Sequence, residues 1–237
     1  MTIINVKDKT EAGKIAAKYL LKALYTKNDA VFAFPGSSIS SEFYKELVNQ
    51  TKTNNYDWKS IISFNLDEYY DLDPKFKDQS SHNYMNKHLF NHININKSNI
   101  YFPWNQNMKE LEIKNYDELI NSFNGLDLTV LGVGIKGQIA FNQQGTEIDS
   151  LTRMVTIDEE TRELNAKFFR NNIDNVPKHA ITIGLKSILN SKAIILIVCG
   201  NMKKNAFLHL KEAQKYDPNW PITALYNHDN LIVLTDL

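Results

Sequence analysis

The stretch that decides the fold reads Leu131-Gly-Val-Gly-Ile-Lys-Gly-Gln-Ile-Ala-Phe-Asn-Gln-Gln-Gly145. Its first residues complete an apolar run that begins at Leu126, as expected for a buried strand. The glycines at 132, 134 and 137 favour a backbone that turns sharply and approaches a ligand closely. The stretch therefore predicts a strand that ends at a binding site, with Lys136, Gln138 and Gln143 as the polar side chains around the turn.

Strand-like and helical segments alternate along the rest of the chain, which favours βα units and a parallel sheet. Strands are expected at residues 30–34, 60–66, 126–133, 180–184, 193–200 and 231–234, and helices at 10–24, 39–52, 81–90, 116–124, 158–169 and 203–215. No linker interrupts the pattern. We expect an α/β fold with a Rossmann-like, mostly parallel central sheet and helices on both faces, in a single domain that spans residues 1–237.

The composition argues against several classes of function. Lysine plus arginine and aspartate plus glutamate both total 27, and no basic block suggests binding to nucleic acid or to a membrane. The N-terminus lacks the layout of a signal peptide, so we expect a cytoplasmic protein. The one cysteine, Cys199, cannot form an intrachain disulfide and is expected to pack as a small core residue.

Two further motifs accompany the 131–145 stretch, Phe64-Asn-Leu-Asp-Glu-Tyr69 and Val176-Pro-Lys-His-Ala-Ile-Thr-Ile-Gly184. With these motifs in this order, residues 10–234 resemble the glucosamine-6-phosphate deaminase/galactosamine-6-phosphate isomerase family of the 6-phosphogluconolactonase-like superfamily. The corresponding family loop reads Gly-Val-Gly-x-Asp-Gly-His-Ile-Ala-Phe-Asn-Glu-Pro. The resemblance implies the family's Rossmann-like sheet and a phosphorylated sugar as the ligand, with no cofactor.

Asp67 is the candidate proton-transfer base. Interconversion of aldose and ketose phosphates needs a group that moves a proton between adjacent carbons, and a carboxylate can do this. The resemblance implies that Asp67 is this base, with Glu68 beside it in the sugar pocket. Both directly follow a predicted strand, where ligands collect in open α/β sheets. The alternative is that Asp67 caps the following segment and Glu68 is merely solvated or salt-bridged.

The ring-opening residues of the family are replaced. The resemblance puts Lys136 at the family's Asp position, Gln138 at its His position and Gln143 at its Glu position. Glutamine does not titrate, so the proton relay is absent, a loss that typically costs about 10²- to 10⁴-fold in rate. In a pocket, Lys136 would favour a more anionic ligand or, less readily, form a Schiff base with an open-chain carbonyl. The alternative is a solvent-facing lysine at a loop tip.

Phosphate binding is expected at three places by resemblance. Gly36, Ser37 and Ser38 align with the family's glycine-rich phosphate turn, although two of its glycines are lost. Lys203 matches a phosphate-binding lysine, and Lys167 stands where the family carries arginine, which preserves charge but not the bidentate fork. Helix capping by serine and solvated lysines on helix faces are the alternatives.

Other polar residues favour no additional site. Arg153 aligns with an arginine that contributes to an effector site in allosteric family members, but the neighbouring lysine is Val155 here, so we expect no such regulation. His228 is expected to make a structural hydrogen bond. His82, His88 and His92 lack a spacing typical of metal ligands, and we predict no metal.

The sequence leaves three functions open. The leading hypothesis is an amino-sugar-phosphate isomerase/deaminase-like protein of carbohydrate metabolism, with Asp67 as the base and without efficient deamination. The second is a non-catalytic sugar-phosphate sensor or partner subunit, that is, a pseudoenzyme. The third is an enzyme for another sugar phosphate or a sugar acid phosphate. The sequence also leaves open whether the chain forms a homo-oligomer.

Overall fold

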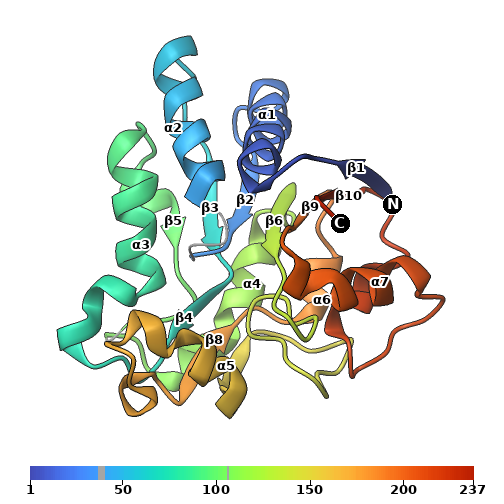
Figure 1. Ribbon diagram of the computed structural model, residues 1–237. Helices are drawn as coiled ribbons and strands as arrows, with labels where there is room; N and C mark the ends of the chain where they lie inside the picture. The colour runs from blue at the N-terminus through green and yellow to red at the C-terminus, as the bar shows by residue number, and fades with distance from the viewer. Residues whose placement is uncertain (37–40, 106) are drawn as a thin grey trace.

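A seven-stranded sheet forms the centre of the molecule (Figure 1), in a computed structural model that describes residues 1–36, 41–105 and 107–237. The strand order is β1-β10-β9-β6-β2-β3-β5, and every pairing in this sheet is parallel. The strands are β1 (Thr2–Asn5), β2 (Val31–Phe34), β3 (Ile62–Asn65), β5 (Ile100–Tyr101), β6 (Leu128–Gly132), β9 (Ile194–Val198) and β10 (Leu231–Thr235).

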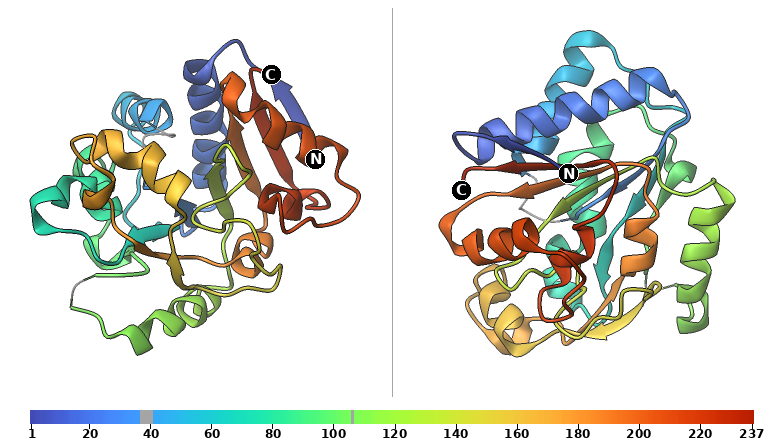
Figure 2. Two further views of the ribbon diagram at one scale, coloured as in Figure 1. Left: turned by 60° about the horizontal axis from the view of Figure 1, so that its bottom comes forward. Right: turned by 90° about the vertical axis from the view of Figure 1, so that its right-hand side faces the viewer.

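Helices cover both faces of this sheet (Figure 2). The helices α1 (Lys9–Thr26), α2 (Ser41–Asn54) and α3 (Ser81–His88) share one apolar cluster, and α4 (Asn115–Ser122), α6 (Leu185–Leu189) and α7 (Lys204–Glu212) share the other. Successive residues of β6 point to opposite faces, as strand geometry requires, so Val130 enters the first cluster and Leu131 the second. The predicted α/β class with helices on both faces is confirmed.

A second, antiparallel sheet lies beyond the end of β3. It has the order β4-β8-β7, with β4 (Asp67–Tyr69), β8 (His179–Thr182) and β7 (Arg153–Thr156). The prediction that residues 180–184 join the parallel sheet is therefore wrong. The chain continues past β3 into β4, whose free edge pairs with β8, and the N–H of Ile183 donates to the carbonyl of Leu66 at 2.8 Å.

The remaining helices are short. They are α5 (Glu159–Asn165) and the 3₁₀ turns η2 (Pro74–Gln79), η3 (Phe90–His92), η4 (Lys97–Asn99), η5 (Glu110–Lys114), η6 (Ala166–Phe168), η7 (Ile173–Asn175), η8 (Asn201–Lys203) and η9 (Pro221–Leu225). The helix predicted at 158–169 ends in the turn η6. The sequence did not predict β1, β4, β7 or α6, each of which has three to five residues. No helix in the described part of the chain is long and apolar enough to cross a membrane.

The single cysteine lies at the end of β9. Cys199 is partly buried against the apolar cluster of α1 and α2, as its apolar surroundings in the sequence predict. Burial raises the pKa of the Cys199 thiol to about 11, so little reactive thiolate is present at neutral pH.

Tyr116 fixes the end of β3, from which the chain enters β4. Its buried hydroxyl accepts from the Asn65 N–H at 3.0 Å and lies 2.9 Å from the Asn65 carbonyl and 3.1 Å from the Tyr101 carbonyl. These contacts join α4 to β3 and β5 two residues before Asp67.

We predict that Tyr116→Phe lowers the free energy of unfolding by about 1–3 kcal/mol, because buried backbone groups lose their partner. Urea denaturation measures this loss. Tyr25→Phe, on an 84% exposed tyrosine of α1, serves as the matched control. Equal stability of the two variants would contradict the prediction.

Candidate functional site

A cavity of about 670 Å³ opens where β2, β3 and β6 end. Its walls come from residues 35–36, from 66–69, from α3, from the loop 132–143, from α5 with η6, and from η8. This is the edge of an open parallel sheet at which ligands bind. Of the predicted site residues, six line the cavity: Gly36, Asp67, Gln138, Gln143, Lys167 and Lys203.

Asp67 lies in the cavity wall at the start of β4. Its side chain accepts a hydrogen bond from the Ser81 hydroxyl at 3.2 Å. Burial raises the pKa of the Asp67 carboxyl to about 6, and the bond from Ser81 opposes that rise. A carboxylate with such a pKa is ionised at neutral pH and is a stronger base than an exposed aspartate, as suits proton transfer.

Glu68 has a structural position instead of the predicted sugar-binding one. It is 5% exposed and is absent from the cavity wall. Its carboxylate accepts from the backbone N–H groups of Tyr69 at 2.8 Å, Ser81 at 3.0 Å and His82 at 2.9 Å. Burial raises the pKa of Glu68 to about 7, while these three bonds oppose the rise. Glu68 therefore anchors the start of α3 beside Asp67.

The two glutamines at the replaced positions, Gln138 and Gln143, connect the loop 132–143 to residues 156–161, which include the start of α5. The Gln143 side chain accepts from the Asp158 N–H at 2.8 Å and donates to the Thr156 carbonyl at 2.8 Å. The Gln138 amide lies 3.4 Å from the Thr161 hydroxyl. An amide can both accept and donate, whereas a carboxylate only accepts, so Gln143 matches its two partners in a way that glutamate would not.

Lys136 completes this set of contacts from outside the cavity. Its ammonium forms an ion pair with Glu160 of α5, and both side chains are nearly half exposed. The hydrogen bond to Glu160 raises the pKa of Lys136. Lys136 is not part of the cavity wall, so the structure does not support the expectation that Lys136 makes the pocket more positive. The structure supports the alternative, a solvent-facing lysine. All three replaced positions thus contact residues 156–161, an arrangement that we term the loop clasp.

Both lysines that were predicted to bind phosphate line the cavity. The Lys203 ammonium donates to the Val133 carbonyl, and burial lowers the pKa of Lys203 to about 8, with Lys9 contributing. Lys167 is exposed at the mouth and lies 5.0 Å from the ring centroid of Phe168. Gly36 is part of the wall, whereas Ser37 and Ser38 lie outside the described residues. A Cβ at Gly36 would meet Ser81 at 2.4 Å, so the site needs glycine there.

Several cavity residues were not predicted from the sequence. The helix α3 contributes Ser81, Tyr84, Lys87 and His88, whose three- and four-residue spacing could have indicated that they share one face of the helix. Tyr69 lines the cavity, while Tyr70 and Trp104 pack on each other outside it with ring centroids 4.7 Å apart.

The other polar residues singled out in the sequence lie elsewhere. His228 Nε2 lies 2.8 Å from the Ser191 carbonyl, in agreement with the predicted structural bond. The Arg153 guanidinium contacts Asn142, Leu151 and Thr146 in a separate hollow of about 450 Å³. In the described residues, no three side chains of histidine, cysteine, aspartate or glutamate are grouped so that they could hold a metal ion.

The fold and the cavity define an α/β protein with an ionisable carboxylate and cations at a sugar-sized site, and comparison with known proteins specifies the family. A profile described as glucosamine-6-phosphate isomerases/6-phosphogluconolactonase matches residues 8–233, and the chain belongs to this family.

Several known proteins are similar to this chain over almost its full length. A glucosamine-6-phosphate deaminase of Malacoplasma penetrans is 39% identical, with 94% of this chain and 93% of the relative covered. One of Bacillus pumilus is 37% identical, with 100% and 97% covered. The solved structure of a monomeric glucosamine-6-phosphate deaminase has a TM-score of 0.93 at 34% identity, covering 99% of this chain and 97% of that one. A 6-phosphogluconolactonase from Thermotoga maritima, at 19% identity and a TM-score of 0.75, shares the fold.

We predict that Gln143→Glu weakens the loop clasp. The glutamate would lose the donor to the Thr156 carbonyl and place a second negative charge near Asp158, so the free energy of unfolding should fall by about 1–3 kcal/mol. Urea denaturation at pH 8 measures this change in the free energy of unfolding, with Gln214→Glu at an exposed residue as the control. A stability loss no larger than that of the control would argue against the clasp.

Asp67 should cost stability when it is ionised. Its carboxyl has a pKa of about 6 in the folded protein, above the value of about 3.9 for an unfolded chain. Its contribution to stability is therefore complete below about pH 3.9 and is lost as the pH rises through 6. Asp67→Asn should therefore be more stable than the parent by about 1–3 kcal/mol at pH 8, with little difference at pH 4. Urea denaturation at both pH values, with Asp229→Asn as a control for the loss of an exposed carboxylate, checks this prediction. A difference independent of pH would contradict it.

Proposed function

We propose that this protein binds a phosphorylated amino sugar and catalyses isomerisation with deamination, with Asp67 as the base that moves the proton. The position of Asp67 carries the proposal: an ionisable carboxylate in the wall of a cavity that also presents Lys167 and Lys203. The similarity to glucosamine-6-phosphate deaminases supports glucosamine 6-phosphate as the first substrate to test.

The chemistry would act on the open-chain aldehyde of the sugar. The Asp67 carboxylate removes the proton from C2 and returns it to C1. The aldehyde oxygen takes up the proton that the amino nitrogen releases, so that a hydroxyl forms at C1 and an imine at C2. Water then adds to C2, and ammonia leaves as the ketose phosphate forms. Lys167 and Lys203, which also line the cavity, would hold the phosphate dianion, with Lys203 donating as a desolvated cation.

Ring opening would receive no general acid–base help from the replaced positions. Gln138 and Gln143 do not titrate near neutral pH, and Lys136 is paired with Glu160 outside the cavity wall. The protein would therefore act on the open-chain form that arises spontaneously, and the turnover rate should be about 10²- to 10⁴-fold below that of a member with an intact relay.

A second candidate, a non-catalytic sugar-phosphate sensor or partner subunit, is favoured by the loop clasp. The three replaced positions make contacts that suit their present side chains, as expected if the loop serves to hold α5. In this alternative the cavity binds the same sugar phosphate, but no proton transfer follows. An enzyme that acts on another sugar phosphate or a sugar acid phosphate would use Asp67 in the same way.

The assay for ammonia and fructose 6-phosphate from glucosamine 6-phosphate tests the proposal. We expect slow turnover whose kcat/KM falls as the pH drops below about 6, because protonation removes the base. Asp67→Asn should reduce kcat by at least about 100-fold while thermal shift shows that the sugar phosphate still binds.

The controls separate the candidates. Turnover that persists in Asp67→Asn would exclude Asp67 as the base. Binding without turnover in the parent protein would favour the sensor or partner subunit. Absence of both turnover and binding, with parallel tests of galactosamine 6-phosphate and 6-phosphogluconate, would redirect the search to another ligand.

A further inference from the structure

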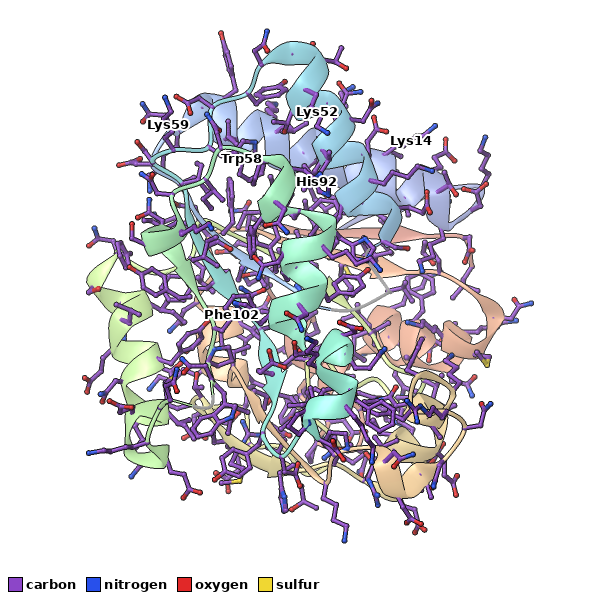
Figure 3. The ribbon with its side chains drawn as sticks, turned by 90° about the vertical axis from the view of Figure 1, so that its left-hand side faces the viewer. Lys14, Lys52, Trp58, Lys59, His92 and Phe102 are labelled. Carbon is purple, nitrogen blue, oxygen red and sulfur yellow. The ribbon has the colours of Figure 1, made fainter. Side chains whose placement is uncertain are left out.

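The helix α3 presents a row of polar side chains to the cavity. Ser81, Tyr84 and the pair Lys87 and His88 follow one another at intervals of three or four residues and all lie in the wall. Figure 3 shows α3 at the front of this face of the molecule, with His92 near the end of the helix that points toward α2. The mechanism proposed above uses Asp67, which Ser81 contacts, and leaves Tyr84, Lys87 and His88 without a role.

The Tyr84 hydroxyl is the unusual member of this row. It is buried and has no hydrogen-bond partner in residues 1–36, 41–105 and 107–237. Leaving a buried hydroxyl unpaired costs about 1–3 kcal/mol, so a partner supplied by a ligand would recover free energy. Burial raises the pKa of Tyr84 to about 12, so this hydroxyl stays protonated and can donate to an acceptor.

The contacts of Tyr84 place it at the Pro35–Gly36 end of the cavity. Its ring packs edge-on against Tyr44, with centroids 6.2 Å apart, and the Tyr44 hydroxyl donates to the Pro35 carbonyl at 2.7 Å. On its other side the ring of His88 lies 4.4 Å from that of Tyr84. Burial lowers the pKa of His88, which keeps the imidazole mostly neutral at physiological pH, and Lys87 supplies a positive charge.

The rise of an α-helix sets the distances along this row. At 1.5 Å per residue, Tyr84 lies about 4–5 Å along the axis from Ser81, and Lys87 and His88 lie about 9–10 Å from it. Ser81 contacts Asp67 and lies against Gly36, so it is near both the proposed base and the predicted phosphate turn. Tyr84 therefore lies within one helical turn of Ser81, on the same face of α3.

We propose that Tyr84 is a phosphate-binding residue, whose hydroxyl donates a hydrogen bond to a phosphate oxygen of the bound sugar phosphate, with Lys87 adding electrostatic attraction. This inference rests on the proposed function for the identity of the ligand. It adds Tyr84 to Lys167 and Lys203 as a residue that binds the phosphate. It also explains why a buried hydroxyl is left unpaired in the free protein.

Tyr84→Phe tests the proposal, because it removes the hydroxyl and keeps the ring. The dissociation constants for inorganic phosphate and for glucosamine 6-phosphate, measured by calorimetry, should both rise by about 5- to 20-fold. The thermal midpoint of the free protein should stay the same or increase, since no bond is lost. Tyr25→Phe, far from the cavity on α1, should leave both constants and the midpoint unchanged.

Three results would overturn the assignment. Unchanged affinity for both ligands would mean that the hydroxyl does not bind, and a loss confined to glucosamine 6-phosphate would place it on the sugar instead of the phosphate. A lower thermal midpoint would mean that the hydroxyl has a partner in the free protein. If the parent protein binds neither ligand, the proposed function fails together with this inference, whereas parental binding that is unaffected by Tyr84→Phe leaves the proposed function standing.

Discussion

The three hydrogen bonds accepted by the Glu68 carboxylate are the interaction on which the site depends. They tie the beginning of α3 to β4, and so fix Ser81 against both Asp67 and Gly36. Without a buried acceptor at this point, the backbone N–H groups of Ser81 and His82 would be left without these bonds. One carboxylate therefore determines the wall of the cavity, while its neighbour Asp67 remains available for chemistry.

Adjacent carboxylates in this chain thus have different tasks because their surroundings differ. Burial raises the pKa of both groups, but Glu68 is enclosed by donors and Asp67 faces the cavity. The loop clasp shows the same principle with neutral groups. Gln143 has one acceptor and one donor to satisfy, so its amide fits where the family's carboxylate would lack a proton to donate. The three positions that the resemblance aligns with the family's relay are thus the positions that form the clasp.

The sequence was sufficient for the parallel sheet and for the position of Asp67, because long apolar runs and glycines at strand ends are strong local signals. It was insufficient for β4 and β7, which are short, and for the antiparallel pairing of these strands with the strand predicted at residues 180–184, which corresponds to β8. The role of Glu68 depends on N–H groups 13 and 14 residues away, and the outward position of Lys136 depends on Glu160. Such tertiary partners leave no periodic trace in the sequence. The cavity face of α3 did have a helical spacing that could have been recognised.

The pairing of β1 with β10 has a consequence for how the chain folds during synthesis. In the described part of the chain, residues 2–5 pair with residues 231–235, so this edge of the sheet stays open until the ribosome has made residues 231–235. The strands that carry the cavity, β2, β3 and β6, are complete about 100 residues earlier. Contacts between such distant segments form slowly, and a nascent chain with an unpaired β1 would be most exposed to edge-to-edge association at this stage.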